Sequence, residues 1–167
     1  MPKIIENLRE QLLTEAEKQI RERGYKNTTI RSVASGCGVA VGTVYNYFKS
    51  KDMLIASFIL TDWLECISSI AAREKEDKRE YLNYIYDSLI AFAARHTDLF
   101  TDSEAAKSFN QALAERHQML RGQLAKLIMP IAGDDFLALF VAEAMLCWTM
   151  DGRSFDDIYE LLPEKIK

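Results

Sequence analysis

Residues 28–54 read TTIRSVASGCGVAVGTVYNYFKSKDML, and this stretch decides the fold. Its periodicity predicts a short helix over about 29–35 and a second over about 41–47. Between them, Gly36 and Gly38 permit a sharp turn, because glycine adopts backbone conformations that other residues avoid. Two short helices joined by a tight glycine turn are typical of a helix-turn-helix.

The second short helix has two different faces. At about 100° per residue, Val44 and Phe48 lie on one side, with Tyr47 beside them. The other side carries no Lys or Glu, only small or flat groups: Gly42, Thr43, Tyr45 and Asn46. Such groups can contact base edges in a DNA major groove, and Val41 can contact a thymine methyl group. The alternative is that the aromatic residues are simply core.

Charge is unevenly distributed along the chain. Residues 1–52 hold nine Lys or Arg and six Asp or Glu, which gives +3, whereas residues 53–167 hold twelve and nineteen, which gives −7. From Arg23 to Lys51 there are five basic residues and no acidic one. A local basic stretch on an acidic chain indicates a protein that presents one end to a polyanion.

Polar groups suited to phosphate contacts flank the two short helices. Thr28 and Thr29 lie at the start of the first. Ser50 and Lys51 lie at the start of the helix that follows the second. Free backbone N–H groups at helix N-termini form an anion site when a hydroxyl or ammonium group lies beside them. Arg31 adds attraction that does not depend on the base sequence.

This stretch resembles the DNA-binding signature of TetR-type transcriptional regulators. The matching features are the threonine before the first short helix, G-V at 38–39, G-T-V-Y at 42–45, Y-F at 47–48 and S-K-x-x-L at 50–54. The resemblance implies a homodimer with a small-molecule pocket in its C-terminal helices. It also implies DNA contacts from Thr28 or Thr29, Ala40, Val41, Gly42, Thr43, Tyr45, Asn46, Tyr47 and Lys51.

Two positions depart from the family pattern. Ala40 stands where serine is common, so it has no side-chain oxygen to cap the helix or touch a phosphate. Val41 replaces a more usual polar or basic residue, so base reading is expected to rely on apolar contact. The alanine leaves an alternative open: a helical protein-binding adaptor or small-molecule sensor that no longer binds DNA.

The rest of the chain also has helical periodicity. A leading amphipathic helix begins near Ile5 and ends before Gly24. Pro130 and Gly133 are expected to end the third of the later helices. These later helices are predicted over about 50–72, 79–96, 103–128, 134–150 and 155–162.

We therefore predict an all-α fold. Its N-terminal part, residues 1–50, is predicted to be a three-helix helix-turn-helix domain that binds DNA. Residues 51–167 are predicted to form a helical bundle for ligand binding and dimerisation.

The helix predicted over 134–150 is apolar on all sides. Between Phe136 and Met150 only Glu143 and Thr149 are polar. Such a helix must be covered on all sides, and a partner chain is the simplest cover for its outer face. We predict an isologous homodimer through 134–150 and 155–162. The alternative is a helix at the centre of a monomer.

Polar residues also fall on apolar stripes. His96 continues one stripe and Arg116 another, and a buried charge needs a partner. Either each is satisfied by an internal acid such as Glu143 or by reaching water, or the two line a pocket for an anionic or hydrogen-bonding ligand. The predicted ligand-binding residues are Trp63, Tyr84, Phe92, His96 and Arg116.

Several classes of protein are disfavoured. The cysteines Cys37, Cys66 and Cys147 are odd in number and widely spaced, which indicates buried thiols in a reducing cytoplasm and no metal site. The densest apolar run, Phe136 to Met150, has 15 residues with Glu143 inside it, short of the roughly 18–20 of a membrane span. The two histidines stand 21 residues apart and no phosphate-binding glycine loop is present, so an enzyme is not expected, nor is a cofactor.

These observations predict a cytoplasmic, ligand-responsive regulator that binds double-stranded DNA. Two copies would read a palindromic operator at positions about 34 Å apart. A small-molecule effector bound by the C-terminal helices would release a repressor of this kind from its operator.

Overall fold

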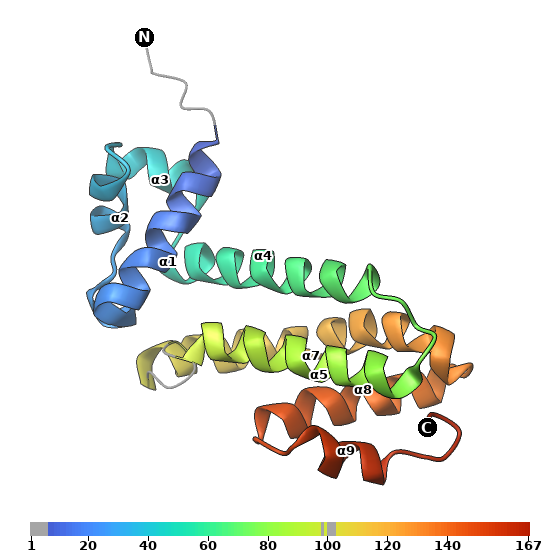
Figure 1. Cartoon of the computed structure of the whole chain (residues 1–167). Coiled ribbons are helices and arrows are strands. Elements are labelled where there is room, and N and C mark those ends of the chain that lie inside the picture. The colour runs from blue at the N-terminus through green and yellow to red at the C-terminus, as the bar shows by residue number, and fades with distance from the viewer. Residues whose placement is uncertain (1–6, 98, 100–102) are drawn as a thin grey trace. The chain divides into compact units, whose positions relative to one another are not determined.

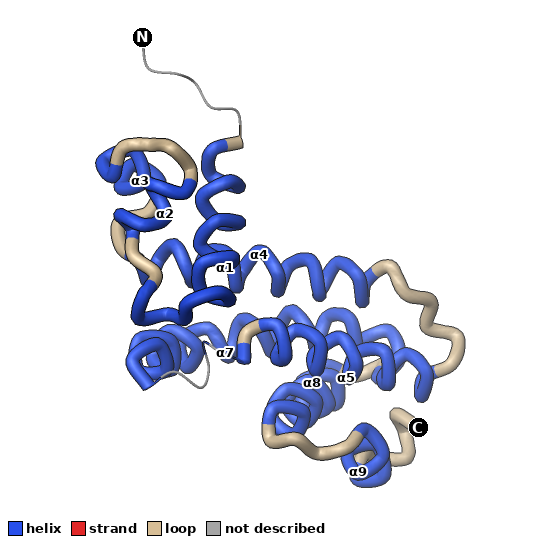
Figure 2. The backbone as a smooth tube through the Cα atoms, turned by 60° about the vertical axis from the view of Figure 1, so that its left-hand side comes forward, coloured by secondary structure: helices blue, strands red, loops and turns tan. Residues whose placement is uncertain are grey.

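The computed structural model describes residues 7–97, 99 and 103–167, and for 103–116 only the backbone. Throughout this described part the regular structure is helical, without a strand (Figure 2). The predicted all-α fold is thereby confirmed. Figure 1 labels the helices: α1 (Leu8–Asn27), α2 (Ile30–Gly36), α3 (Val41–Tyr47), α4 (Lys51–Ala71), α5 (Lys78–Arg95), α7 (Ser103–Ala132), α8 (Asp135–Met150) and α9 (Phe155–Leu161).

The chain forms two compact units. The N-terminal unit comprises Met1–Asp62 and His96–Gln111, and the C-terminal unit comprises Trp63–Arg95 and Ala112–Lys167. The division falls within α4 and within α7, so each of these two helices contributes residues to both units.

α1, α2 and α3 form the core of the N-terminal unit. α1 buries Leu12 and Ala16 against its neighbours, and α2 buries Val33. Helical hydrogen bonding continues past Gly24 to Asn27, but Gly24 itself has φ +79°, so the helix kinks where its end was predicted. Ile5, where this helix was predicted to begin, lies outside the described residues.

The turn between α2 and α3 is a Schellman motif. The Val39 N–H donates to Ala34 O at 2.9 Å and the Gly38 N–H to Ser35 O at 3.1 Å. Gly38 has φ +65°, a conformation that favours glycine. The half-buried Cys37 lies in this turn, and burial raises the pKa of its thiol, so the group stays neutral.

The C-terminal unit packs α5 against α8 and α8 against α9. Its core includes Leu82 and Ile85 of α5, Ile128 of α7 and Val141 of α8, all fully buried. The Tyr81 hydroxyl donates to the carbonyl of Leu127 at 3.1 Å and so links α5 to α7.

Pro130 does not end α7, contrary to the prediction. The helix runs through it to Ala132 and ends at Gly133, which has φ +67°. A proline in the last turn removes one hydrogen bond near a helix end, where few remain to be lost, so the left-handed glycine is the stronger terminator.

α4 is more apolar than the sequence analysis recognised. It has the length and composition of a membrane-crossing helix, with a mean hydropathy of 1.5 over 18 residues. Core helices of soluble proteins share these properties, and one such helix is weak evidence for a membrane.

Candidate nucleic-acid interface

α3 has one buried and one exposed face. Val44 is fully buried and Phe48 is 3% exposed, whereas Tyr45 and Tyr47 keep 45% and 46% of their surface exposed. The exposed or half-buried side of the helix consists of Val41, Gly42, Thr43, Tyr45, Asn46 and Tyr47. This face offers two aromatic rings, one amide and three hydroxyl groups, and it carries no charged side chain.

Gly42 is not needed by the fold. A Cβ atom added there meets nothing within 4 Å. By contrast, a Cβ atom at Gly36 would collide with the end of the Glu15 side chain, which would have to move. Glycine inside a helix costs about 0.5–1 kcal/mol relative to alanine. The open space beside Gly42 leaves its backbone accessible to another molecule.

The two threonines before α2 have different environments. The Thr29 hydroxyl caps α2 by accepting from the Ser32 N–H at 3.0 Å, while the Ser32 hydroxyl accepts from the Thr29 N–H at 2.9 Å. This reciprocal pair is a capping box. Thr28 is only 1% exposed, and its hydroxyl donates to Gly24 O at 3.0 Å. Thr29 therefore faces outward and Thr28 inward.

A buried glutamine joins α1 to α2. Gln19 is 1% exposed, and its amide donates to Ser32 O at 3.0 Å and to a Glu15 carboxylate oxygen at 2.6 Å. The Ser32 hydroxyl donates to Gln19 Oε1 at 2.5 Å. Sequence reasoning missed this residue, although a polar side chain next to the apolar Ile20 and Ala16 was an available signal.

Tyr25 links the end of α1 to the start of α4 by hydrogen bonds. The Lys51 ammonium donates to Tyr25 O at 2.5 Å and lies 3.5 Å from the centre of its ring. The Tyr25 hydroxyl donates to Asp52 at 2.5 Å. Ser50 caps α4 by accepting from the Met53 N–H at 3.1 Å. The predicted phosphate contact Lys51 is therefore half-buried and held in place by α1.

The remaining predicted DNA contacts are solvent-accessible. Arg31 is exposed on α2, and Ala40 is exposed at the start of α3. Ala40 makes no side-chain cap, as its residue type dictates. Its carbonyl still accepts from the Thr43 N–H at 2.9 Å, which begins the helix.

Of the predicted ligand-binding residues, the structure brings Trp63 and Phe92 together. Their rings meet edge to face at 5.4 Å, and Trp63, 2% exposed, donates from Nε1 to Gln123 at 2.7 Å. Tyr84 has other partners. Its hydroxyl is 2.6 Å from the hydroxyl of Ser69, and the Arg73 guanidinium lies 5.0 Å from the centre of its ring.

Of the other two predicted ligand-binding residues, the structure describes the side chain of His96 only. His96 is 2% exposed and its Nε2 lies 3.1 Å from a carboxylate oxygen of Asp62. An internal acid therefore faces His96, but it is Asp62 and not Glu143. The side chain of Arg116 lies outside the described residues. Glu143 instead contacts His117 at 2.9 Å and Arg121 at 3.5 Å.

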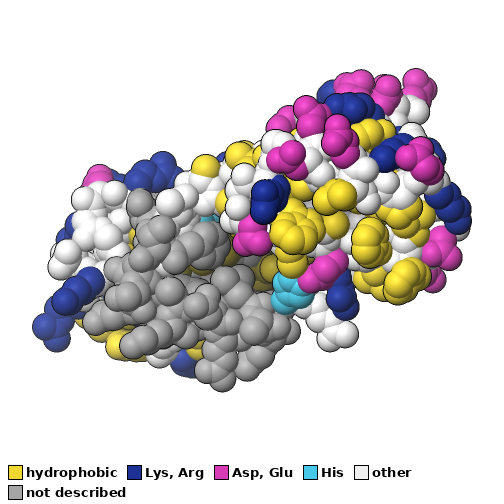
Figure 3. All heavy atoms as spheres, turned by 90° about the horizontal axis from the view of Figure 1, so that it is seen from below, with side chains coloured by type: hydrophobic (Ala, Val, Ile, Leu, Met, Phe, Trp, Pro, Cys, Tyr) yellow, Lys and Arg dark blue, Asp and Glu magenta, His cyan; other side chains and the backbone are white. Residues whose placement is uncertain are grey.

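α8 is buried on one face only. Ala138, Val141 and Met145 point into the C-terminal unit, while Phe140 and Trp148 are 47% and 44% exposed. Exposed hydrophobic side chains gather on the face shown in Figure 3. α8 and α9 line a groove of about 650 Å³ that includes Phe140, Trp148 and Leu161. Within the described part of one chain, α8 is thus not a fully central helix.

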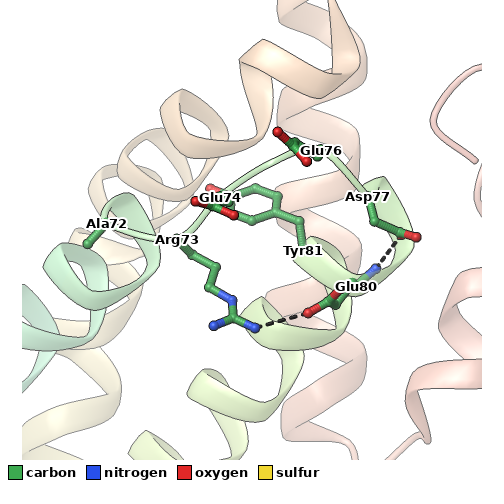
Figure 4. A pocket seen from close by; sticks show the side chains of 7 residues that line it. All are labelled: Ala72, Arg73, Glu74, Glu76, Asp77, Glu80 and Tyr81. Carbon is green, nitrogen blue, oxygen red and sulfur yellow. Dashed lines mark hydrogen bonds and ion pairs between the residues drawn. The ribbon is translucent and has the colours of Figure 1, made fainter.

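A second hollow, of about 450 Å³, lies at the connection between α4 and α5. Figure 4 shows Arg73 pointing to Glu80, 3.0 Å away, and Asp77 accepting from the Glu80 N–H at 2.9 Å. Acidic side chains dominate its lining, so the hollow is polar and belongs to the solvated connection between the two helices.

The N-terminal unit thus defines a helix-turn-helix protein. Residues 12–58 match the family described as bacterial regulatory proteins, tetR family. The resemblance to TetR-type regulators is thereby confirmed over these residues.

Similar proteins are named as regulators and not as enzymes. The HTH-type transcriptional repressor KstR2 of Mycolicibacterium smegmatis is 36% identical over 58 residues, 34% of this chain and 28% of that protein. The HTH-type transcriptional regulator UidR of Escherichia coli is 25% identical over 83 residues, 50% and 41% of the two chains. The match thus spans less than half the length of either curated relative.

A solved structure has the same fold over most of the chain. The transcriptional regulator FadR from Bacillus subtilis, in complex with stearoyl-CoA, aligns with a TM-score of 0.53 and 22% identity, over 95% of this chain and 99% of that one.

Proposed function

We propose that this chain is a cytoplasmic transcriptional regulator that binds duplex DNA by placing α3 in a major groove. The exposed side of α3, with Gly42, Tyr45 and Asn46, is the observation that carries the proposal. Amide and hydroxyl groups there can reach base edges, and the open glycine lets the backbone approach. The absence of acidic residues between Arg23 and Lys51 avoids repulsion of phosphates.

Thr29, Arg31 and Lys51 are the proposed phosphate contacts. Thr29 and Arg31 are exposed on the same end of α2. Lys51 is oriented by its bond to Tyr25 O, so little side-chain freedom is lost on binding. Thr28 is assigned a structural role instead, because its hydroxyl is buried and bonded to Gly24 O.

A homodimer through α8 and α9 completes the proposal. The exposed Phe140, Trp148 and Leu161 offer an apolar surface of the kind that a second copy would cover. Two-fold symmetry would then present two α3 helices to a palindromic operator with half-sites about 34 Å apart.

A small-molecule effector is proposed to release the repressor from DNA. The similar FadR of Bacillus subtilis, whose structure is in complex with stearoyl-CoA, supports an apolar ligand for the C-terminal unit. α4 begins in one unit and ends in the other, and its Trp63 is buried against Phe92. A ligand that shifts α4 would therefore change the placement of α3, with a coupling of about 1–3 kcal/mol.

Selection of duplexes from a random pool tests DNA binding. The wild-type chain is expected to enrich an inverted repeat and to lose affinity steeply from about 50 to 200 mM salt. Arg31→Ala, which removes a proposed phosphate contact, is expected to weaken binding, whereas Lys126→Ala, which removes an exposed lysine from the C-terminal unit, is not. A chain that enriches no sequence, or whose binding ignores salt, would support the adaptor alternative.

Stearoyl-CoA is a direct probe of the effector proposal. The Trp148→Phe variant leaves Trp63 as the only tryptophan, so its fluorescence reports on the C-terminal unit. Binding is expected to change this fluorescence and to weaken retention of the selected duplex. Unchanged fluorescence together with unchanged DNA binding would reject acyl-CoA as the effector class.

A further inference from the structure

Three groups that commonly bind metals meet on α7 and α8, within the C-terminal unit. His117 Nε2 lies 2.9 and 3.0 Å from the two carboxylate oxygens of Glu143. The Cys147 thiol donates to Glu143 Oε1 at 3.3 Å. One ligand atom from each residue lies within 4.8 Å of the other two.

The sequence places these groups together in a simple way. Glu143 and Cys147 are four residues apart on α8, so they share one face of the helix. His117 comes from α7, which explains why spacing along the chain did not predict the cluster. All three side chains are accessible: His117 and Glu143 are 42% and 39% exposed, and Cys147 is exposed.

We propose that His117, Glu143 and Cys147 form a binding site for Zn²⁺. Imidazole nitrogen, carboxylate oxygen and thiolate sulfur are the ligand types that zinc binds, at about 2.0–2.3 Å. In a tetrahedral site such bonds separate the ligand atoms by roughly 3.3–3.8 Å. The observed separations of Glu143 from its two partners, 2.9–3.3 Å, need only small side-chain adjustments to reach that geometry.

The charges of the site also fit a divalent cation. Glu143 and a Cys147 thiolate together neutralise two positive charges, and the Asp151 carboxylate acts on Cys147 as further negative charge. The Arg121 guanidinium lies 3.5 Å from Oε2, which leaves Oε1, the oxygen facing Cys147, for the metal. Three protein ligands leave a fourth position that water can reach.

Binding of the metal displaces one proton. Burial first, and then Glu143 and Asp151, raise the pKa of Cys147 to about 11, so its sulfur carries a proton near neutral pH. The S–H bond breaks as the Zn–S bond forms, and the proton passes to solvent. The rival explanation is an ion pair of Glu143 with His117 and Arg121, which makes no use of the thiol.

Co²⁺, a spectroscopic substitute for Zn²⁺, distinguishes a metal site from the ion pair. In the full-length Cys37→Ser/Cys66→Ser variant, Cys147 is the only thiol. We expect one Co²⁺ per chain, with thiolate-to-cobalt absorption that Zn²⁺ abolishes by displacement. Adding Cys147→Ser should remove this absorption. His117→Gln or Glu143→Gln should weaken binding of Zn²⁺ about tenfold or more, while Arg121→Gln, the matched control, should not weaken it.

Two results would overturn the site. One is a folded Cys147-only protein, verified by circular dichroism, that gives no thiolate absorption with Co²⁺. The other is absorption that persists after Cys147→Ser. Thermal unfolding gives an independent measurement: Zn²⁺ should raise the Tm of the wild-type chain and leave that of the Cys147→Ser variant unchanged.

Discussion

The Gln19 amide donates to the carbonyl of Ser32 at 3.0 Å, and the Ser32 hydroxyl donates back to Gln19 Oε1 at 2.5 Å. The same hydroxyl accepts from the Thr29 N–H as part of the α2 capping box. The buried glutamine therefore holds α2, and with it the turn that leads to α3, against α1.

Gln19→Leu is expected to lower the free energy of unfolding by about 1–3 kcal/mol, because it removes the hydrogen bonds that join the buried Gln19 to Ser32 and to Glu15. Urea unfolding followed by circular dichroism measures this change. Gln118→Leu, at an exposed position of α7, is the control and should change stability by less than about 0.5 kcal/mol. Equal effects of the two substitutions would show that the bonds of Gln19 contribute nothing specific.

Gly42→Ala separates folding from DNA binding. Because a Cβ atom there meets nothing in the protein, alanine should raise the stability by about 0.5–1 kcal/mol. The same methyl group should obstruct an approaching duplex and weaken binding of the selected duplex by about tenfold, or 1.4 kcal/mol. The measurements are urea unfolding and a gel-shift titration. A variant that is more stable and binds equally well would exclude close approach at Gly42.

The periodicity of apolar residues predicts which side chains of a helix share a face, and this part of the site could be predicted from the sequence. The 3.6-residue period places Val44 and Phe48 on one side of α3 and Tyr45 and Asn46 on the other, and burial in the structure agrees. The two faces of a short helix depend only on residues close together in the sequence, so they can be predicted from that sequence alone.

Contacts between helices are not local in this sense. The bonds of Tyr25 to Asp52 and of His96 to Asp62 join residues 27 and 34 positions apart, and they depend on how two helices dock. Periodicity shows that His96 lies on an apolar stripe but not which acid faces it. For the same reason Glu143 could be named from the sequence only as one possible partner of His96 or Arg116, and in the structure it contacts His117.

Stability at high pH should depend on Tyr81. Burial raises its pKa from 10.0 to about 12. The folded chain therefore holds the neutral phenol more strongly than the unfolded chain does. This contribution is fully present below pH 10 and is lost as the pH rises towards 12, by at most about 2–3 kcal/mol.

Tyr81→Phe is the matched variant for this effect. Below pH 10 it should be less stable than the wild type by about 0.5–1.5 kcal/mol, because the bond to Leu127 O is lost. Near pH 12 the difference should shrink or reverse, since phenylalanine does not ionise. Urea unfolding of both proteins across this range measures the difference, and parallel pH dependence would contradict the assignment.

The exposed face of α8 predicts the oligomeric state. Phe140 is 47% exposed and lines the groove with Trp148 and Leu161, so a charge placed there should prevent a second copy from covering the surface. Phe140→Arg is expected to sediment as a monomer where the wild type sediments as a dimer. It should also bind a palindromic duplex more weakly than the wild type does. Ile90→Arg, at a position of α5 that is 38% exposed, is the control and should remain dimeric. Sedimentation equilibrium measures both. If Phe140→Arg stays dimeric, the homodimer must form through a surface other than this groove.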